Sequence, residues 1–206
     1  MPGTKTRARD ADVTREALLR AALAEFSRHN FKTATVRAVA KRARVNHAVI
    51  RYHFGSKDEL WREAVRYLFE RQIAELDFES LYGQGLDDHA LLREGLARYV
   101  RYSARHPEHA RIAVQESIAG GTRLRWMARN YIRAFHANMA PPLERLMEAG
   151  ALPKANVIST IYLLAHAAHS VFLLAEELRV VHGQDPYSDA FVEAHVDAVL
   201  ALIARA

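Results

Sequence analysis

The chain has 206 residues, of which 50% are hydrophobic and 26% charged, and it contains no cysteine. This composition is sufficient for a hydrophobic core and excludes disulfides and thiolate metal sites, so we expect a cytoplasmic protein. Residues 1–57 hold 13 Lys and Arg against 4 Asp and Glu, a net charge of +9, whereas residues 58–206 hold 16 against 20, a net charge of −4. A basic segment joined to a mildly acidic body is typical of a polyanion-binding module with a second function attached.

The first residues are polar, with no apolar run behind them, so we expect no signal peptide. Lys5, Arg7 and Arg9 form either an arm that follows phosphates or a loose terminus with incidental charge. A first helix is predicted from about Val13 to Arg28, because apolar residues recur there with the helical period.

Residues 35–57 predict a helix-turn-helix. Thr35 can cap one short helix and Asn46 the next. Val45 and Ile50 have the spacing of a hydrophobic staple, which holds Ile50 inward. The outward side of the second helix enters the DNA major groove in this motif. That side carries His47, Ala48, Arg51 and Tyr52.

This stretch resembles the DNA-binding domain of the tetracycline-repressor (TetR) family of bacterial transcription regulators. The residues that match, in the order and at the spacing of that family, are Thr35-Val36-Arg37, Val39-Ala40, Ala43-x-Val45, Ile50, Tyr52-His53-Phe54-Gly55-Ser56-Lys57 and Asp58-Glu59-Leu60. Two residues depart from the family pattern. Arg44 stands where the turn usually carries Gly, and Arg51 stands where the recognition helix usually carries Tyr. The first departure raises the question of backbone strain, since Arg does not easily adopt a positive φ.

The predicted DNA-binding residues all belong to this motif, and they are Thr35, Arg37, Asn46, His47, Arg51, Tyr52, His53 and Lys57. Thr35, at a helix N-terminus, and Lys57 are predicted to hold phosphates, and the resemblance implies the same role for His53.

Base edges of the DNA are within reach of Asn46, His47 and Arg51, while Tyr52 can serve either role. Arg51 either reads a base or replaces the family Tyr as a phosphate contact. We favour base reading, because Arg has the bidentate geometry that matches the paired acceptors of guanine.

A connecting helix is predicted to begin at Ser56 with a capping box, since Glu59 stands three residues later, and to continue to about Leu76. The glycine-containing segment at 81–85 is the predicted loop and domain boundary. We therefore expect a DNA-binding domain over residues 1–57, a connecting helix over residues 57–78, and a ligand-binding and dimerisation domain over residues 79–206.

The remaining periodicity is helical and contains no alternating strand pattern, which predicts an all-α protein of about nine or ten helices. We expect Asp87 or Asp88 to cap the next helix and Pro107 to open the one after it. Pro141-Pro142 is expected to break or sharply kink the chain.

A long helix is predicted from Asn156 to His182, with apolar residues on more than one face. One small core can bury only one such face. We therefore expect this helix and the last one to form a four-helix interface with a second copy, with Ala168 in its small-residue face, and the resemblance implies the same homodimer. A wholly internal central helix is the alternative. The apolar run within it contains polar residues that make a membrane span too costly.

A third, more polar stripe of that helix carries two histidines, His166 and His169. The stripe lines either a ligand cavity or a core in which neighbours satisfy the histidines, and a shared metal ion lacks identifiable further ligands. Aromatic residues elsewhere in the body are either cavity lining or plain core. The predicted ligand-binding residues are Tyr99, Tyr102, Trp126, Phe135, Tyr162, His166, His169 and Phe172.

Catalytic signatures are absent from the sequence, which has no Gly-rich phosphate loop, metalloprotease helix, nucleophile elbow or paired-carboxylate motif. We expect neither catalysis nor a cofactor. The resemblance implies a dimeric repressor that a small-molecule effector releases from a double-stranded DNA operator. The alternative is a constitutive DNA-binding module whose helical body binds a protein or metal partner. Release of DNA by a saturating small molecule separates the two hypotheses.

Overall fold

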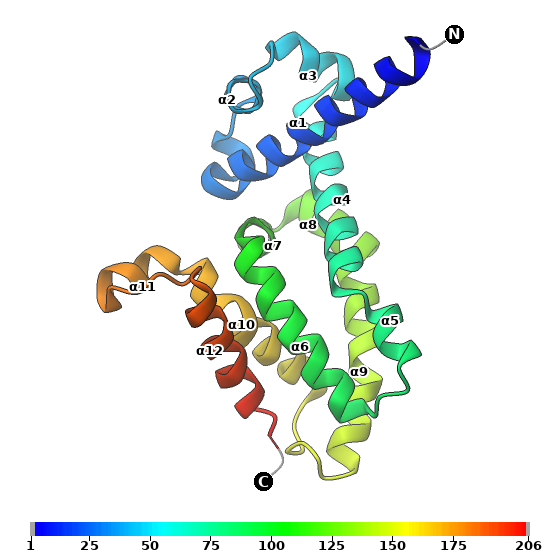
Figure 1. Ribbon diagram of the computed structural model, residues 1–206, viewed down its shortest axis with the longest axis vertical. Helices are drawn as coiled ribbons and strands as arrows, with labels where there is room; N and C mark the ends of the chain where they lie inside the picture. Colours follow the sequence, from blue (N-terminus) through cyan, green and yellow to red (C-terminus); the bar gives the residue numbers. More distant parts are fainter. Residues whose placement is uncertain (1–2, 205–206) are drawn as a thin grey trace. The chain divides into compact units, whose positions relative to one another are not determined.

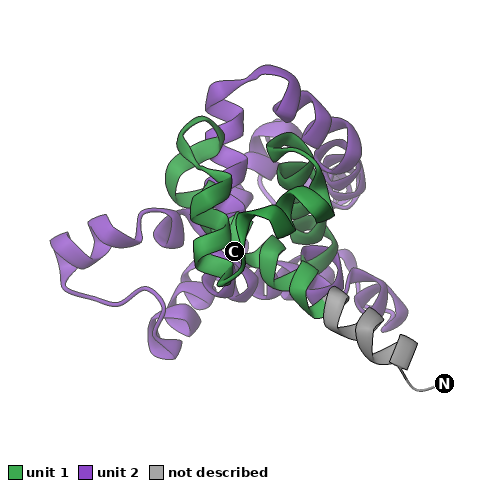
Figure 2. Cartoon of the chain, turned by 90° about the horizontal axis from the view of Figure 1, so that it is seen from above, with its two compact units in different colours: residues 1–71 green, residues 72–206 purple. Residues whose placement is uncertain are grey.

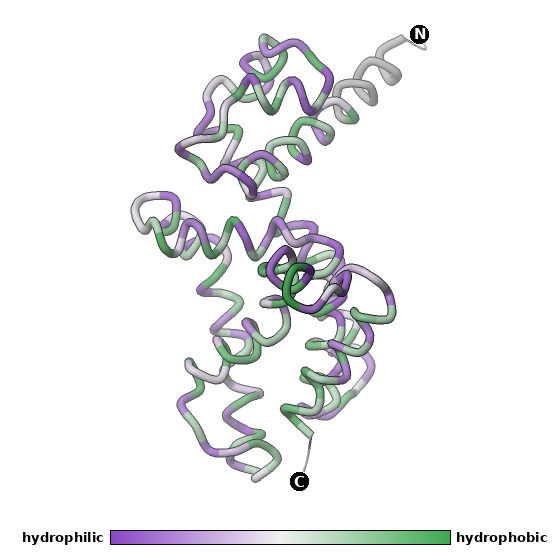
Figure 3. Tube along the Cα trace, turned by 90° about the vertical axis from the view of Figure 1, so that its left-hand side faces the viewer, coloured by the Kyte–Doolittle hydropathy of each residue, from purple (hydrophilic) through white to green (hydrophobic). Residues whose placement is uncertain are grey.

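The computed structural model describes residues 3–204, with side chains from residue 13 onward, so the arm residues Lys5, Arg7 and Arg9 lie outside the described side chains. The described residues form twelve α-helices and one π-helix and contain no strand, which confirms the all-α class (Figure 1). The chain divides into two compact units, Met1–Arg71 and Gln72–Ala206 (Figure 2). Hydrophilic and hydrophobic residues alternate along most helices, the pattern of amphipathic helices around a core (Figure 3).

The first unit contains α1 (Gly3–Thr33), α2 (Val36–Ala43), α3 (His47–Phe54) and most of α4 (Lys57–Leu76). Helix α1 is longer than predicted at both ends and is interrupted at Asn30, where φ is 53°. The Asn30 side chain accepts hydrogen bonds from the backbone N–H groups of Lys32 (2.9 Å) and Thr33 (3.3 Å). This local cap explains why the helical turns continue beyond the predicted end.

The core of this unit draws one face from each of its helices. Fully buried side chains include Leu18, Phe26, Val39, Ile50 and Trp61. At the surface α1 and α4 are joined by the ion pair of Arg15 with Glu63 and by the Tyr67 hydroxyl, which donates to Glu16 over 2.9 Å. Polar contacts at or near the surface contribute little, so the buried apolar face is what holds the unit together.

The second unit is built around one central helix, α6 (Asp88–Arg105), which packs against α9, α10 and α12. Its other elements are α5 (Phe78–Gly83), α7 (Pro107–Ala119), α8 (Gly121–Met127), the π-helix η1 (Ala128–Ile132), α9 (Arg133–Glu148), α10 (Val157–Leu173), α11 (Ala175–His182) and α12 (Asp189–Ala201). Asp87 caps α6 by accepting from the N–H of Ala90 at 2.8 Å, and Pro107 opens α7, both as predicted.

The predicted loop at residues 81–85 is partly helical, because α5 extends to Gly83. Leu81 is completely buried, and Asp77 caps the helix by accepting from the N–H of Ser80 at 3.4 Å. The two glycines favoured a loop, but one apolar anchor and one cap are sufficient for a helix of six residues.

Of the two outcomes predicted for Pro141-Pro142, a break or a sharp kink, the break is wrong, since both prolines lie inside α9. They remove two backbone donors, yet the helix continues because Leu143, Leu146 and Met147 directly after them are buried in the core. Tertiary packing therefore outweighs the local preference of proline.

The predicted single helix over residues 156–182 is two helices, α10 and α11, bent by 65°. The carbonyl oxygen of Phe172 accepts from the Tyr187 hydroxyl (3.2 Å) and from the Arg111 guanidinium (3.4 Å), so partners outside the helix satisfy it where α10 ends. Ala168, expected in a dimer interface, is completely buried within its own chain. Among the described helices none is long and apolar enough alone to cross a membrane; by length and composition only, the bent α10–α11 pair reaches that threshold.

Candidate functional site

The N-terminus of α2 is capped as predicted. The Thr35 hydroxyl oxygen accepts from the backbone N–H of Ala38 at 3.1 Å, and the side chains of Thr35 and Arg37 are exposed. The remaining N–H groups of this first turn lie at the positive end of the helix dipole, which is a favourable environment for a phosphate.

The turn between α2 and α3 places Arg44 in the left-handed region, with φ 57° and ψ 39°. The Arg44 N–H donates to the carbonyl of Lys41 (3.2 Å) and the Val45 N–H to the carbonyl of Ala40 (3.0 Å). This is the Schellman pattern, in which glycine is the usual residue at the left-handed position. The departure at Arg44 therefore keeps the turn and places a side chain where the backbone disfavours one.

Helix α3 has one buried face and one solvent-exposed face, which we call its open face. Asn46 caps it by accepting from the N–H of Ala48 at 2.9 Å, and Ile50 and Phe54 are buried beneath. On the opposite side His47, Arg51 and Tyr52 are exposed, and the Tyr52 side chain is 85% exposed. An aromatic residue this exposed beside a cation and an imidazole forms a surface suited to stacking and hydrogen bonding with a partner.

His53 and Lys57 differ from these residues because both are half-buried. The His53 ring packs edge-on against Tyr52, with 5.2 Å between ring centroids. The Lys57 ammonium lies 4.6 Å from the centroid of Phe31. In the first turn of α4 the helix dipole disfavours a cation, and the ring face offsets part of that cost. The sequence gives no signal for this contact, because Phe31 and Lys57 are 26 positions apart in the chain.

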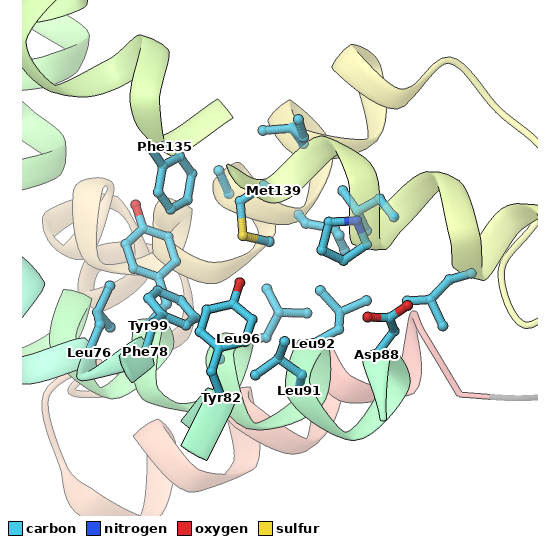
Figure 4. A pocket seen from close by; sticks show the side chains of 17 residues that line it. Leu76, Phe78, Tyr82, Asp88, Leu91, Leu92, Leu96, Tyr99, Phe135 and Met139 are labelled. Carbon is cyan, nitrogen blue, oxygen red and sulfur yellow. The ribbon is translucent and has the colours of Figure 1, made fainter. Parts of the chain in front are cut away.

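A second candidate site is an apolar cavity in the unit over residues 72–206 (Figure 4). The space between its side chains, open mouth included, amounts to about 720 Å³, but only about 50 Å³ of it is wide enough for the centre of a water molecule. Ligand pockets usually have about 300–1,000 Å³, and the 50 Å³ is the volume to compare with that range, because the larger figure includes open solvent. The cavity is therefore constricted in this structure. Helices α6, α9 and α10 supply most of its lining, which includes Leu92, Leu96, Tyr99, Phe135, Met139 and Ile161.

Comparison with known proteins relates the chain to bacterial transcription regulators. Residues 18–64 match the bacterial regulatory proteins of the tetR family. The HTH-type transcriptional repressor NicS of Pseudomonas putida is 31% identical over 150 residues, which are 71% of this chain and 68% of NicS. The chain belongs to the TetR family. The HTH-type transcriptional repressor SCO4008 of Streptomyces coelicolor is 31% identical over 115 residues, 56% of this chain and 55% of that protein.

Solved structures agree with a TetR fold. HlyIIR, a hemolysin II transcriptional regulator, superposes with a TM-score of 0.63 at 19% identity, covering 91% of this chain and 97% of its own. The fatty acid degradation regulator FadR of Bacillus halodurans superposes with a TM-score of 0.64 at 15% identity, covering 90% of this chain and 97% of its own. At these identities the likeness shows the fold alone.

Of the eight predicted ligand-binding residues of this TetR protein, two line the cavity, Tyr99 and Phe135. Tyr102 is one turn beyond Tyr99 but turns toward α7, where its hydroxyl lies 2.9 Å from Nδ1 of His109. Trp126 packs edge-on against Tyr131, with 5.7 Å between centroids, and Phe172 is completely buried against Tyr187. These three residues lie outside the cavity because their helices direct them to other contacts.

The polar stripe of α10 also lies outside the cavity. Tyr162 and His166 are exposed, and the Nδ1 of His166 lies 2.8 Å from the carbonyl oxygen of Tyr162. His169 is buried against the Tyr99 ring, and its Nδ1 has no hydrogen-bond partner. Burial, reinforced by the nearby His166, lowers the pKa of His169 to about 4, so its imidazole is neutral at pH 7. Among the described side chains no group of three or more His, Asp or Glu is placed to hold a metal ion.

Sequence reasoning missed the lining contributed by the end of α4 and by α5, namely Leu76, Phe78 and Tyr82. Gly83 and Gly85 predict a loop in this segment, and a loop has no defined face that could line a cavity. The signal available was the Leu76-Asp77-Phe78 sequence itself, which places two large apolar side chains around one polar residue.

Proposed function

We propose that this TetR-family chain is a homodimeric, DNA-binding transcriptional repressor that leaves its operator when a small molecule occupies the cavity of its body. The relatives NicS and SCO4008 are both transcriptional repressors, which supports this function. The observation that carries the proposal is the open face of α3, where His47, Arg51 and Tyr52 are exposed above buried Ile50 and Phe54. A face of this kind is what a recognition helix presents to the major groove.

The chemistry of each side chain decides whether we assign it to DNA phosphates or to base edges. We assign three groups to phosphates, which position the motif: Thr35 at the N-terminus of α2, His53 in the last turn of α3, and Lys57 in the first turn of α4. Asn46, His47 and Arg51 are assigned to base edges, which specify sequence, and Tyr52 has the reach for either. Arg37 adds an exposed positive charge beside Thr35.

We assign DNA reading to residues 1–57, the link to residues 57–78, and effector binding and dimerisation to residues 79–206. One exposed side of α10 carries large apolar side chains that a monomer would leave in water: Ile158, Tyr162 and Leu163 are 58%, 53% and 70% exposed. Leu202 at the end of α12 is 66% exposed. Burial of such a patch against a second copy supports the homodimer.

The function is tested by fluorescence anisotropy with the DNA that flanks the protein's own gene and with scrambled DNA of the same length and composition. A specific repressor is expected to bind one segment of the flanking DNA about 10³-fold or more tightly than the scramble at physiological salt. Equal affinity for the two would contradict sequence-specific repression. Effector release is then tested by adding small molecules to the preformed complex.

A further inference from the structure

The cavity lining has a narrow chemistry that restricts what can occupy it. Its charged lining residue, Asp88, is held by Arg145 through two hydrogen bonds of 2.6 and 2.8 Å, and Arg145 lowers the pKa of Asp88. Tyr99 adds a hydroxyl, whose pKa burial raises to about 12. None of the described lining residues is cationic. An anionic ligand would therefore be buried without a counter-charge, which is costly.

The cavity is also elongated. Asp88, Leu92, Leu96 and Tyr99 follow one another along one face of α6, a length of roughly 16 Å at the rise of an α-helix. In Figure 4 Asp88 and Leu76 mark opposite ends of the lining. The shape fits a chain-like molecule rather than a compact one.

The ring of Phe78 occupies part of this space because residue 95 is a glycine. A Cβ atom at Gly95 would lie 2.8 Å from Cε1 and 3.4 Å from Cζ of Phe78, so any other residue at this position would force the ring to move. A glycine inside a helix is destabilising relative to alanine. Its place here is explained by the ring that rests on the bare backbone of α6.

The same stretch of α6 holds the end of α4. Arg98, one turn after Gly95, donates from Nη1 to the carbonyl of Leu76 (3.0 Å) and to that of Asp77 (3.2 Å). Asp77, with φ 45°, is the single residue between α4 and Phe78. A displaced Phe78 ring would therefore pull on the residue that ends α4, and α4 runs unbroken to Lys57 beside the recognition helix.

From these contacts we propose that Phe78 is a built-in plug of the cavity, and that an elongated, uncharged, apolar molecule acts as effector by displacing the ring from Gly95. This inference rests on the proposed function and deepens it by naming the class of effector and the side chain that responds. Displacement changes the end of α4, and the effector favours the arrangement whose reading heads misfit the operator.

The first test imitates the ligand by substitution. Without any added molecule, Gly95→Ala is expected to lower operator affinity at least 10-fold, because its methyl group displaces the ring. Gly83→Ala is the matched control: a Cβ there meets nothing within 4 Å and φ is ordinary, so affinity should stay within 2-fold of wild type. The double variant Gly95→Ala/Phe78→Ala lacks the ring and should recover wild-type affinity to within 3-fold. Unchanged binding by Gly95→Ala, or no recovery in the double variant, would overturn the coupling.

The second test addresses the plug and needs no DNA, so it is independent of whether the protein represses. The probes are 1-decanol and decanoate at pH 8. Binding of each probe is measured from the shift that it causes in the thermal unfolding midpoint of the full chain. Decanol should bind at least 10-fold more tightly than decanoate, and Phe78→Ala should bind decanol several-fold more tightly than wild type. Absence of decanol binding, preference for decanoate, or weaker binding by Phe78→Ala would each overturn the proposal. Failure of wild type to select its operator would instead refute the repressor function.

Discussion

The backbone N–H of Val45 donates to the carbonyl of Ala40 over 3.0 Å, and this bond closes the turn in which Arg44 adopts a φ of 57°. The turn sets the entry of the recognition helix, and it is built on a residue that pays a steric penalty there. The TetR-family pattern of glycine at this position identifies the substitution that removes the strain.

Arg44→Gly is expected to stabilise the chain against unfolding by up to about 1 kcal/mol, because glycine has no Cβ to strain in the left-handed region, less the entropy that glycine adds to the unfolded chain. Chemical denaturation monitored by circular dichroism measures the change. Arg44→Ala removes the same charge and keeps the Cβ, so it should bring no stabilisation. Equal effects of Gly and Ala would show that charge, not backbone, is responsible.

The buried His169 predicts a dependence of stability on pH. Its pKa is about 4 in the folded chain, below the ordinary value of 6.5, so the unfolded chain binds more protons between these values. Stability is therefore lost as the pH falls from about 6.5 to about 4. At pH 5 protonation of this residue in the unfolded chain lowers the free energy of unfolding by about 2 kcal/mol. His195, whose pKa is also lowered by burial, adds to the loss in the same direction.

His169→Phe is expected to lessen the fall in unfolding free energy between pH 7 and pH 5 by about 2 kcal/mol, because the variant has no group there to titrate. It also removes the unpartnered buried Nδ1. Urea denaturation at the two pH values gives the comparison. Parallel curves for wild type and variant would contradict the buried, neutral imidazole.

The dimer interface is tested at Leu163, which is 70% exposed on α10. Leu163→Glu should leave the chain folded and weaken the dimer by about 10³-fold, since each copy loses about 2 kcal/mol of apolar burial. Ile118→Glu, at a side chain 82% exposed on α7, is the matched control and should leave the dimer intact. Sedimentation equilibrium at micromolar concentration distinguishes the two variants. A wild-type protein that is itself monomeric there would refute the dimer.

The recognition motif could be predicted from the sequence because its determinants are local. Thr35 and Asn46 cap the helices that follow them within three residues, and Ile50 needs only a helical period to face inward. Nothing distant is required to place the open face of α3.

The body was harder to predict because distant contacts decide its details. The end of α10 depends on Tyr187 and Arg111, which bond the carbonyl of Phe172 from other parts of the chain. The helix through Pro141-Pro142 depends on buried leucines after it. The cavity likewise includes Phe78 only because Gly95, 17 positions later, leaves room for its ring.

Arg51 is the exposed cation of α3 that replaces the family Tyr, and we expect it to read a base. Arg51→Ala should then cost about 1–3 kcal/mol on the operator and relax the preference at one base pair, with little loss on scrambled DNA. Exposed Arg37, beside the α2 cap, serves as comparison. Arg37→Ala should weaken binding to every sequence alike and make the salt dependence shallower.

The most direct test of DNA recognition through the open face of α3 is the operator-to-scramble affinity ratio of Arg51→Ala, measured by anisotropy at several salt concentrations with Arg37→Ala in parallel. Arg51→Ala is expected to lower this ratio about 5-fold to 150-fold, while Arg37→Ala should leave it unchanged. An Arg51→Ala protein that keeps the wild-type ratio, and loses affinity equally on both DNAs, would contradict base reading by this helix.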